Sequence, residues 1–157
     1  MNDAIYLGID FGYRNPFACL WIQVREHGER VVVLDEYYRR LRTTAENARE
    51  ILAQSKTMGY MPISAVYADP SNPEGHATLA NILGVPVQAP RRPVTVGQEL
   101  VRQWLKLRPE GKPGLLISHR CKNLIRELQT YMAHEPGKGE HHALDALRYF
   151  FAGWDGA

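Results

Sequence analysis

The order of strand-like and helix-like segments limits the fold of this chain more than any other feature. Residues 5–9, 17–26 and 30–38 are rich in β-branched, aromatic and other apolar residues, and a short turn containing glycine joins the last two. This pattern predicts three consecutive strands, of which the second and third form an antiparallel hairpin. From residue 43 onward, helix-like and strand-like segments alternate. Such an order predicts a mixed α/β sheet with helices on both faces.

Helix start signals divide the alternating part of the chain. Thr43 and Glu46 have the spacing of a capping box, and Thr95 and Gln98 resemble a second one. Asn72, followed directly by proline, predicts another helix start. The expected helices cover residues 43–58, 73–84, 95–107, 121–132 and 141–153, and the expected further strands cover residues 64–69, 85–87 and 115–118.

Length and composition fit one domain with a substantial core. The chain has 157 residues, of which 45% are hydrophobic and 23% charged, and no long segment has the composition of a disordered region. The net charge of +2 permits a polyanionic partner such as nucleic acid without requiring one. We therefore expect residues 1–157 to form a single domain.

Cysteine usage and hydropathy indicate the cellular setting. Cys19 and Cys121 are far apart and form no CxxC pair, which favours free thiols in a reducing compartment and argues against a zinc site. The sequence contains no run of about eighteen apolar residues, so we expect no membrane span. It also shows no signal peptide, because no basic segment precedes an apolar one at the start. These features favour a cytoplasm, the chain's own or a host's.

Three aspartates stand where a charged side chain needs an explanation. Asp10 and Asp69 each come at the end of a strand-like segment, and Asp145 lies within His141–Phe151, which predicts a mostly buried helix. Each has an ordinary interpretation when it is taken alone. An aspartate at a strand end commonly forms a turn or a helix cap. Asp145 has Arg148 three residues later as an ion-pair partner on the same helix.

Taken together, the three aspartates predict a metal site. Sites in open α/β sheets form at the carboxyl ends of strands, so Asp10 and Asp69 converge if their strands are neighbours. A helix packed across that edge brings in Asp145. Three carboxylates so close together repel one another, and divalent cations remove this conflict. Carboxylate oxygens suit Mg²⁺ or Mn²⁺, and two such ions can hold the attacking and leaving oxygens of a phosphodiester.

Four segments resemble the nuclease domain of viral (bacteriophage) terminase large subunits, which belongs to the ribonuclease H-like superfamily. They are GIDFGYRNPFACLW (8–21), VYADPSNPE (66–74), RRPVTVGQELVRQWL (91–105) and HHALDALRYFF (141–151). The resemblance covers nearly the whole chain in the right order, and the Asp-Ala-Leu-Arg-Tyr motif is its most specific part. It implies a ribonuclease H-like mixed sheet, with three antiparallel strands followed by parallel strands and with helices on both faces.

The same resemblance implies a function. The domain would be a metal-dependent endonuclease, a hydrolase that cleaves concatemeric viral double-stranded DNA during genome packaging, using two divalent ions, Mg²⁺ or Mn²⁺. Terminase large subunits also carry an ATPase domain, and no GxxxxGK[ST] loop occurs here, so we expect the nuclease domain alone. Implied partners of the full-length protein are DNA, the ATPase domain, the portal and the small terminase subunit. The implied location is the viral procapsid in the host cytoplasm.

Motif positions assign the catalytic and metal-binding role to Asp10, Asp69 and Asp145, with Asp10 bridging both ions. Family members often carry an Asp-His pair before the last motif, where this chain has His141-His142. Either histidine can face Asp145 on a helix, and His142 is a candidate to orient a metal-bound carboxylate. The ordinary interpretation is that the two histidines only begin a helix.

The remaining site candidates are one acidic and four basic residues. Glu74 either points toward Asp69 or favours the start of the helix in which it lies. Arg91 and Arg92 precede a helix N-terminus, where cations oppose the helix dipole, so they either bind phosphate or belong to a solvated loop. Arg14 either contacts DNA or holds its turn, and Lys138 either touches DNA or belongs to a linker. Low sequence specificity is expected, because phosphate contacts carry no sequence information.

Three alternative functions stay open. A Holliday-junction resolvase or a transposase core has the same fold and cuts branched DNA or transposon ends. An actin-like or sugar-kinase-like half-domain begins similarly, but it needs a glycine-rich phosphate loop after Asp10, where this chain continues Tyr-Arg-Asn-Pro after Gly12. A non-catalytic DNA-binding or capsid-docking module would use its carboxylates only for structure.

Overall fold

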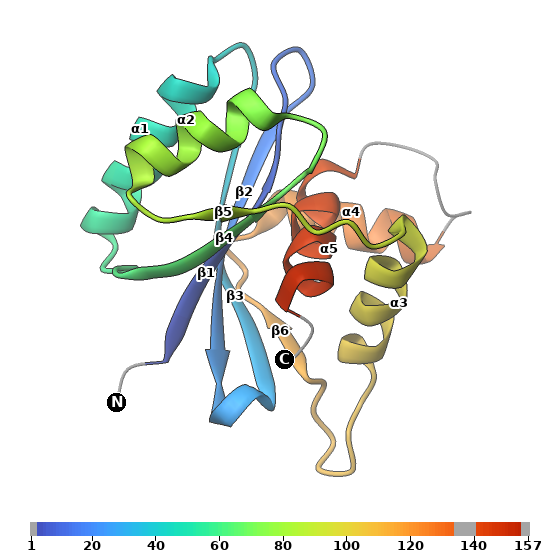
Figure 1. Ribbon diagram of the computed structural model, residues 1–157. Helices are drawn as coiled ribbons and strands as arrows, with labels where there is room; N and C mark the ends of the chain where they lie inside the picture. The colour runs from blue at the N-terminus through green and yellow to red at the C-terminus, as the bar shows by residue number, and fades with distance from the viewer. Residues whose placement is uncertain (1–2, 134–140, 155–157) are drawn as a thin grey trace.

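The computed structural model describes residues 3–133 and 141–154, and in these residues one mixed sheet organises the fold (Figure 1). Its order is β5-β4-β1-β2-β3-β6. Strand β2 is antiparallel to β1 and β3, whereas the pairs β1–β4, β4–β5 and β3–β6 are parallel. The expected sheet, three antiparallel strands followed by parallel ones, is confirmed. The strands are β1 (Ala4–Asp10), β2 (Phe17–Arg25), β3 (Arg30–Arg39), β4 (Ile63–Ala68), β5 (Val87–Gln88) and β6 (Leu115–Ile117).

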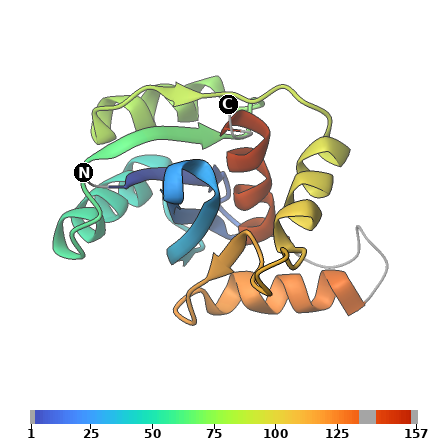
Figure 2. The same cartoon turned by 90° about the horizontal axis from the view of Figure 1, so that it is seen from below.

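Helices cover both faces of this sheet, as expected. Helices α1 and α2 pack together on one face, and α5 lies directly against β1, β2 and β4 on the other. Helices α3 and α4 pack against α5 on that second face (Figure 2). The helices are α1 (Thr44–Thr57), α2 (Pro73–Leu83), α3 (Val94–Leu105), α4 (Lys122–Ala133) and α5 (His142–Trp154), with a short 3-10 turn η1 (Glu26–Gly28) between β2 and β3.

Two of the three expected helix caps are present. The hydroxyl of Thr43 accepts from the backbone amide of Glu46 at 3.1 Å, and the Glu46 carboxylate accepts from the Thr43 amide at 3.0 Å. Asn72 caps α2 through its side-chain oxygen. The third prediction is wrong, because α3 begins at Val94 with no side-chain cap. Thr95 therefore lies inside the first turn, two residues after the N-cap position, which Pro93 occupies.

A glycine in β1 allows α5 to lie close to the sheet. Leu7 and Ile9 are fully buried in the cluster under α1 and α2, and Gly8 between them faces α5. A Cβ atom at Gly8 would lie 2.3 Å from the carbonyl oxygen of Ala146 on α5. Any side chain here would push α5 away. Asp10 is two residues beyond Gly8, so it faces α5 as well.

The thiols of Cys19 and Cys121 are buried and free, as the sequence indicated. Within the described part of the chain, no helix is long and apolar enough to cross a membrane.

Candidate active site

Asp10 and Asp69 leave the sheet side by side. Strands β1 and β4 are parallel neighbours, and the pairing of Ile9 with Ala68 places the next residue of each strand at the same edge. Each aspartate also has local contacts. The Asp69 carboxylate accepts from the backbone amide of Ser71 at 2.8 Å, a turn-forming bond of the ordinary kind. The sequence therefore predicted the convergence correctly, and the turn interpretation of Asp69 holds alongside it.

Asp10 is the most desolvated of the three carboxylates, with 8% of its surface exposed. Burial raises the pKa of Asp10 from 3.8 to about 6, against the lowering effect of its bond to His142. The negative charges of Asp145 and Asp69 raise the pKa further. All three predicted catalytic residues therefore interact electrostatically at the carboxyl end of β1.

His142 contacts Asp10. Its Nδ1 lies 3.1 Å from Oδ2 of Asp10, within hydrogen-bond distance. Helical spacing allows either histidine of the pair to face Asp145, and it does not predict this contact with a strand residue. The first turn of α5 packs against β1, which brings His142 to the aspartate at the end of that strand. Its expected use, to orient a candidate metal-binding carboxylate, is compatible with this contact.

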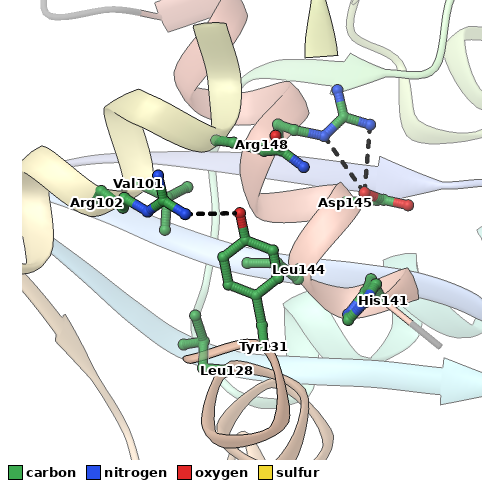
Figure 3. Close-up of a pocket in the computed structure, with 9 residues that line it drawn as sticks. Val101, Arg102, Leu128, Tyr131, His141, Leu144, Asp145 and Arg148 are labelled. Atoms are coloured by element: carbon green, nitrogen blue, oxygen red, sulfur yellow. Dashed lines mark hydrogen bonds and ion pairs between the residues drawn. The ribbon is translucent and has the colours of Figure 1, made fainter. Parts of the chain in front are cut away.

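Asp145 pairs with Arg148 one turn further along α5. Both Nε and Nη2 of Arg148 lie 3.3 Å from the same oxygen, Oδ1 of Asp145 (Figure 3). The Arg148 side chain is 8% exposed and that of Asp145 37% exposed. The ordinary interpretation of Asp145, an ion pair within its helix, is thus also correct. It does not exclude a metal-binding role, because only one carboxylate oxygen is used in this pair.

The donor set of this site fits a divalent cation. Three aspartates from β1, the end of β4 and α5 offer the hard oxygen ligands that Mg²⁺ and Mn²⁺ prefer. The desolvation of Asp10 is an unfavourable term that a bound cation offsets. Among residues 3–133 and 141–154, however, no three Asp, Glu, His or Cys side chains lie close enough together to hold one ion.

His141 lines the same cavity as Asp145 without a side-chain hydrogen bond to it, and Glu74 lies in the first turn of α2. The ring of His141 packs edge-on against Tyr131, 5.7 Å between centroids, and borders a cavity of about 40 Å³ between α3, α4 and α5 (Figure 3). Both of its ring nitrogens are buried without a hydrogen-bond partner among the described residues. Glu74 is exposed in the first turn of α2, as its ordinary interpretation predicts, and no hydrogen bond between described residues joins it to Asp69.

Two of the four basic candidates border an open groove beside Asp69. Arg91 and Arg92 are exposed and line this groove together with Asp69, Pro70, Pro90, Val94, Arg148 and Tyr149. Arg14 is exposed after β1, and its carbonyl accepts from the guanidinium of Arg40 at 3.0 Å, which supports its turn interpretation. Lys138 lies outside the described residues.

Two neighbours of the site were not singled out from the sequence. Nε2 of His76 lies 2.6 Å from the backbone carbonyl oxygen of Asp69, and its ring contacts Phe11. Burial and the charge of Asp69 are the largest of the effects that raise the pKa of Tyr149, and Asp10 and Asp145 add to them. Helical spacing could have identified Tyr149 as a neighbour of the site, because it lies one turn after Asp145 on α5.

The sheet order and the helices on both faces define a ribonuclease H-like fold, the class found in the nuclease domains of phage large terminases. A large terminase from a thermophilic bacteriophage superposes with a TM-score of 0.77 at 23% identity, over 97% of this chain and 40% of that one. The nuclease domain of the bacteriophage SPP1 large terminase, solved with bound Mn, gives a TM-score of 0.68 at 23% identity, over 95% and 85% of the two chains.

Sequence comparison points to the same group. The chain is 26% identical over 155 residues to the terminase large subunit of Escherichia phage T5, which covers 91% of this chain and 34% of that protein. The chain thus spans about a third of the length of this curated relative. No protein-family model matches it. The resemblance seen in the four sequence motifs is confirmed at the level of fold.

Proposed function

We propose that this chain is a divalent-metal-dependent DNA endonuclease that cleaves concatemeric viral double-stranded DNA during genome packaging. The observation that carries the proposal is that Asp10 and Asp69 follow neighbouring parallel strands at one edge of the sheet, where the charges of Asp145 and Asp69 both raise the pKa of Asp10. Structural neighbours support it, because the SPP1 nuclease domain was solved with manganese and another phage terminase nuclease with zinc and with cobalt. Mg²⁺ or Mn²⁺, in two copies, is the assignment that we propose here.

The chain's own residues have separable tasks in this reaction. Bound divalent ions supply Lewis acidity, which activates a water molecule and stabilises the leaving oxygen. Asp10 holds its carboxylate at the desolvated centre of the site, where His142 fixes the orientation of Oδ2. Asp69 and Asp145 provide ligands from either side. His76 holds the backbone of Asp69 through the carbonyl oxygen, so that the strand end keeps its direction.

The groove beside Asp69 is the proposed path of the DNA strand. Arg91 and Arg92 on its rim match the charge of the phosphate backbone, and they precede the N-terminus of α3. Contacts of this kind bind any sequence, so specificity should be low. In a full-length protein we propose the further partners of a packaging motor: an ATPase domain, the portal and a small terminase subunit, at the procapsid in the host cytoplasm.

Plasmid cleavage tests the proposal. We expect cleavage with Mn²⁺ or Mg²⁺, none with EDTA, and a loss of at least about a hundredfold in Asp10→Asn, Asp69→Asn and Asp145→Asn. Asp3→Asn, an exposed aspartate next to the opposite end of β1, is the matched control and should cleave normally.

Two outcomes would favour the alternatives. Preferred cleavage of a four-way junction over linear duplex would indicate a resolvase of the same fold. Wild-type chain that binds duplex without cutting it under any metal, with unchanged binding in the three variants, would indicate a docking module.

A further inference from the structure

We propose that Arg148 couples metal binding to DNA binding. In the metal-free chain it neutralises Asp145, and when a metal ion takes that carboxylate, its guanidinium becomes available to a DNA phosphate in the adjoining groove. This inference rests on the function proposed above. It gives Arg148 two alternative partners, Asp145 in the metal-free chain and a DNA phosphate in the metal-bound chain.

The ion pair between Arg148 and Asp145 is loose and uses one oxygen. Both guanidinium nitrogens lie 3.3 Å from Oδ1, longer than the ~2.7–2.9 Å of strong charge-assisted hydrogen bonds. A bidentate pair would instead engage both oxygens of the carboxylate. The arrangement fits a contact that an incoming cation can displace, rather than a permanent structural bond.

Packing fixes the stem of Arg148 and leaves its head beside the groove. A Cβ atom at Gly97 of α3 would lie 2.1 Å from Cγ of Arg148, so the two helices hold the start of the side chain between them. The guanidinium carbon lies 4.6 Å from the ring centroid of Tyr149. Movement is therefore confined to the outer part of the side chain, which can pivot over this ring.

The groove offers the second position for the guanidinium. Arg148 borders it together with Asp69, Arg91, Arg92 and Tyr149. Arg148 therefore borders the groove and is at the same time ion-paired to Asp145, a candidate ligand that does not line the groove. In Figure 3 its head points toward Asp145 and away from Tyr131.

Electrostatic interactions favour the Asp145 contact of the Arg148 guanidinium in the metal-free chain and oppose it in the metal-bound chain. A divalent cation on Asp145 cancels the attraction for the nearby guanidinium and repels it. A largely buried cation without a partner is unfavourable, and a DNA phosphate restores one. Because coupling is reciprocal, metal binding then strengthens DNA binding, and DNA binding strengthens metal binding by the same factor.

The test compares Arg148→Met, which keeps the stem without the charge, with the wild type. Arg126→Met is the matched control, since Arg126 is an exposed, ion-paired arginine on α4. Calorimetry measures Mn²⁺ affinity without DNA. Fluorescence anisotropy measures affinity for a short duplex over a range of salt concentrations, in EDTA and in Ca²⁺, with the duplex checked for integrity.

We expect Arg148→Met to bind Mn²⁺ about fivefold tighter or more, because no cation competes for Asp145. We also expect the slope of log K against log salt concentration to fall by about 0.9 in Ca²⁺, the loss of one phosphate contact, and to stay unchanged in EDTA. Arg126→Met should match the wild type in both respects. Unchanged or weaker Mn²⁺ affinity of Arg148→Met, or an equal slope change in EDTA and Ca²⁺, would overturn the inference alone.

Two further results keep the inference testable. If Arg148→Met does not fold, a crystal structure of the wild-type chain with Mn²⁺ decides: a guanidinium still bonded to Asp145 contradicts the proposal, and one turned into the groove supports it. Wild-type chain that binds no metal at all would overturn the proposed function and this inference together.

Discussion

The ionised carboxylate of Asp10 is unfavourable in the folded, metal-free chain because its side chain is buried. Its pKa is raised to about 6, mainly by burial, so the folded chain accepts its negative charge less readily than the unfolded chain does. For a carboxyl with a raised pKa, the stabilising contribution is complete below the unfolded value near 4 and is lost as pH rises through 6. Above that range, metal-free chain carries an uncompensated charge.

The variant Asp10→Asn should therefore be more stable than the wild type in EDTA at pH 7.5. We expect the unfolding free energy of Asp10→Asn to exceed that of the wild type by up to about 3 kcal/mol, because the pKa of Asp10 rises from 3.8 to about 6 on folding. The advantage should shrink below pH 4, where the wild-type carboxyl is protonated in both states. Urea unfolding followed by tryptophan fluorescence measures it. Asp3→Asn should show no such dependence, and a variant less stable than the wild type at pH 7.5 would contradict the burial argument.

The sequence located the three candidate aspartates on their elements, but it did not predict all of their contacts. The positions of Asp10 and Asp69 followed from the rule that parallel strands end at one edge, and helical spacing correctly paired Asp145 with Arg148. The contact of His142 with Asp10 depends on how α5 crosses β1, and spacing within one helix contains no such information. The bond from His76 to the Asp69 backbone likewise depends on the turn between β4 and α2.

At the scale of the elements, one buried glutamate attaches α5 to its neighbours. Glu127 of α4 is 2% exposed, and its carboxylate accepts from the backbone amide of Leu144 at 2.9 Å and from the hydroxyl of Tyr38 at 2.8 Å. The first bond satisfies an amide in the first turn of α5, the turn that carries His142 and Asp145. Glu127 thus sets the position of the candidate ligands without touching them.

Removal of this carboxylate in Glu127→Ala should lower the unfolding free energy by about 2–4 kcal/mol, because the buried Leu144 amide and the partly buried Tyr38 hydroxyl lose their acceptor. Tyr38→Phe, which deletes one of the two bonds, should cost about 1 kcal/mol. Burial raises the pKa of Glu127, so its contribution to stability falls as pH rises through the folded value. Glu127→Gln should flatten that fall with pH in chemical unfolding, and an unchanged pH profile would contradict this role.

The contact between α3 and α5 requires a residue without a side chain at position 97. Alanine normally stabilises a helix relative to glycine by about 0.5–1 kcal/mol. In Gly97→Ala the new methyl group would overlap Cγ of Arg148, so we expect a loss of about 1–3 kcal/mol instead. Thermal or urea unfolding measures it, with Thr95→Ala on the exposed side of α3 as the control, expected within about 0.5 kcal/mol of the wild type. A stabilised Gly97→Ala would show that the helices can separate freely.

Element boundaries were predictable where local chemistry decides them. The capping box at Thr43 and the Asn72 cap were correct, because the side chain that satisfies the first amides lies next to them in sequence. The similar signal at Thr95 was misleading, since α3 begins directly after Pro93 and packs through Gly97 against α5. Packing between elements, rather than a local cap, determines the start of that helix.

At the scale of the whole molecule, the candidate ligands come together only when the chain is folded. Asp10, Asp69 and Asp145 belong to β1, the β4–α2 turn and α5, and the last is more than 70 residues from the others in sequence. An unfolded chain therefore cannot present this site, and metal binding must stabilise the fold by mass action. This effect is independent of cleavage, so it tests the metal site without DNA.

Saturating Mn²⁺ should raise the melting temperature of the wild-type chain. At a hundred times the dissociation constant, one bound ion contributes about 2.7 kcal/mol, which corresponds to roughly 5–10 °C for a domain of this size. Asp69→Asn and Asp145→Asn should each lose most of this shift, whereas Asp3→Asn should keep it. Scanning calorimetry with and without EDTA measures the shift. An equal shift in a variant that combines Asp10→Asn, Asp69→Asn and Asp145→Asn would place the bound ion elsewhere on the chain, and the assigned carboxylates would then need another explanation.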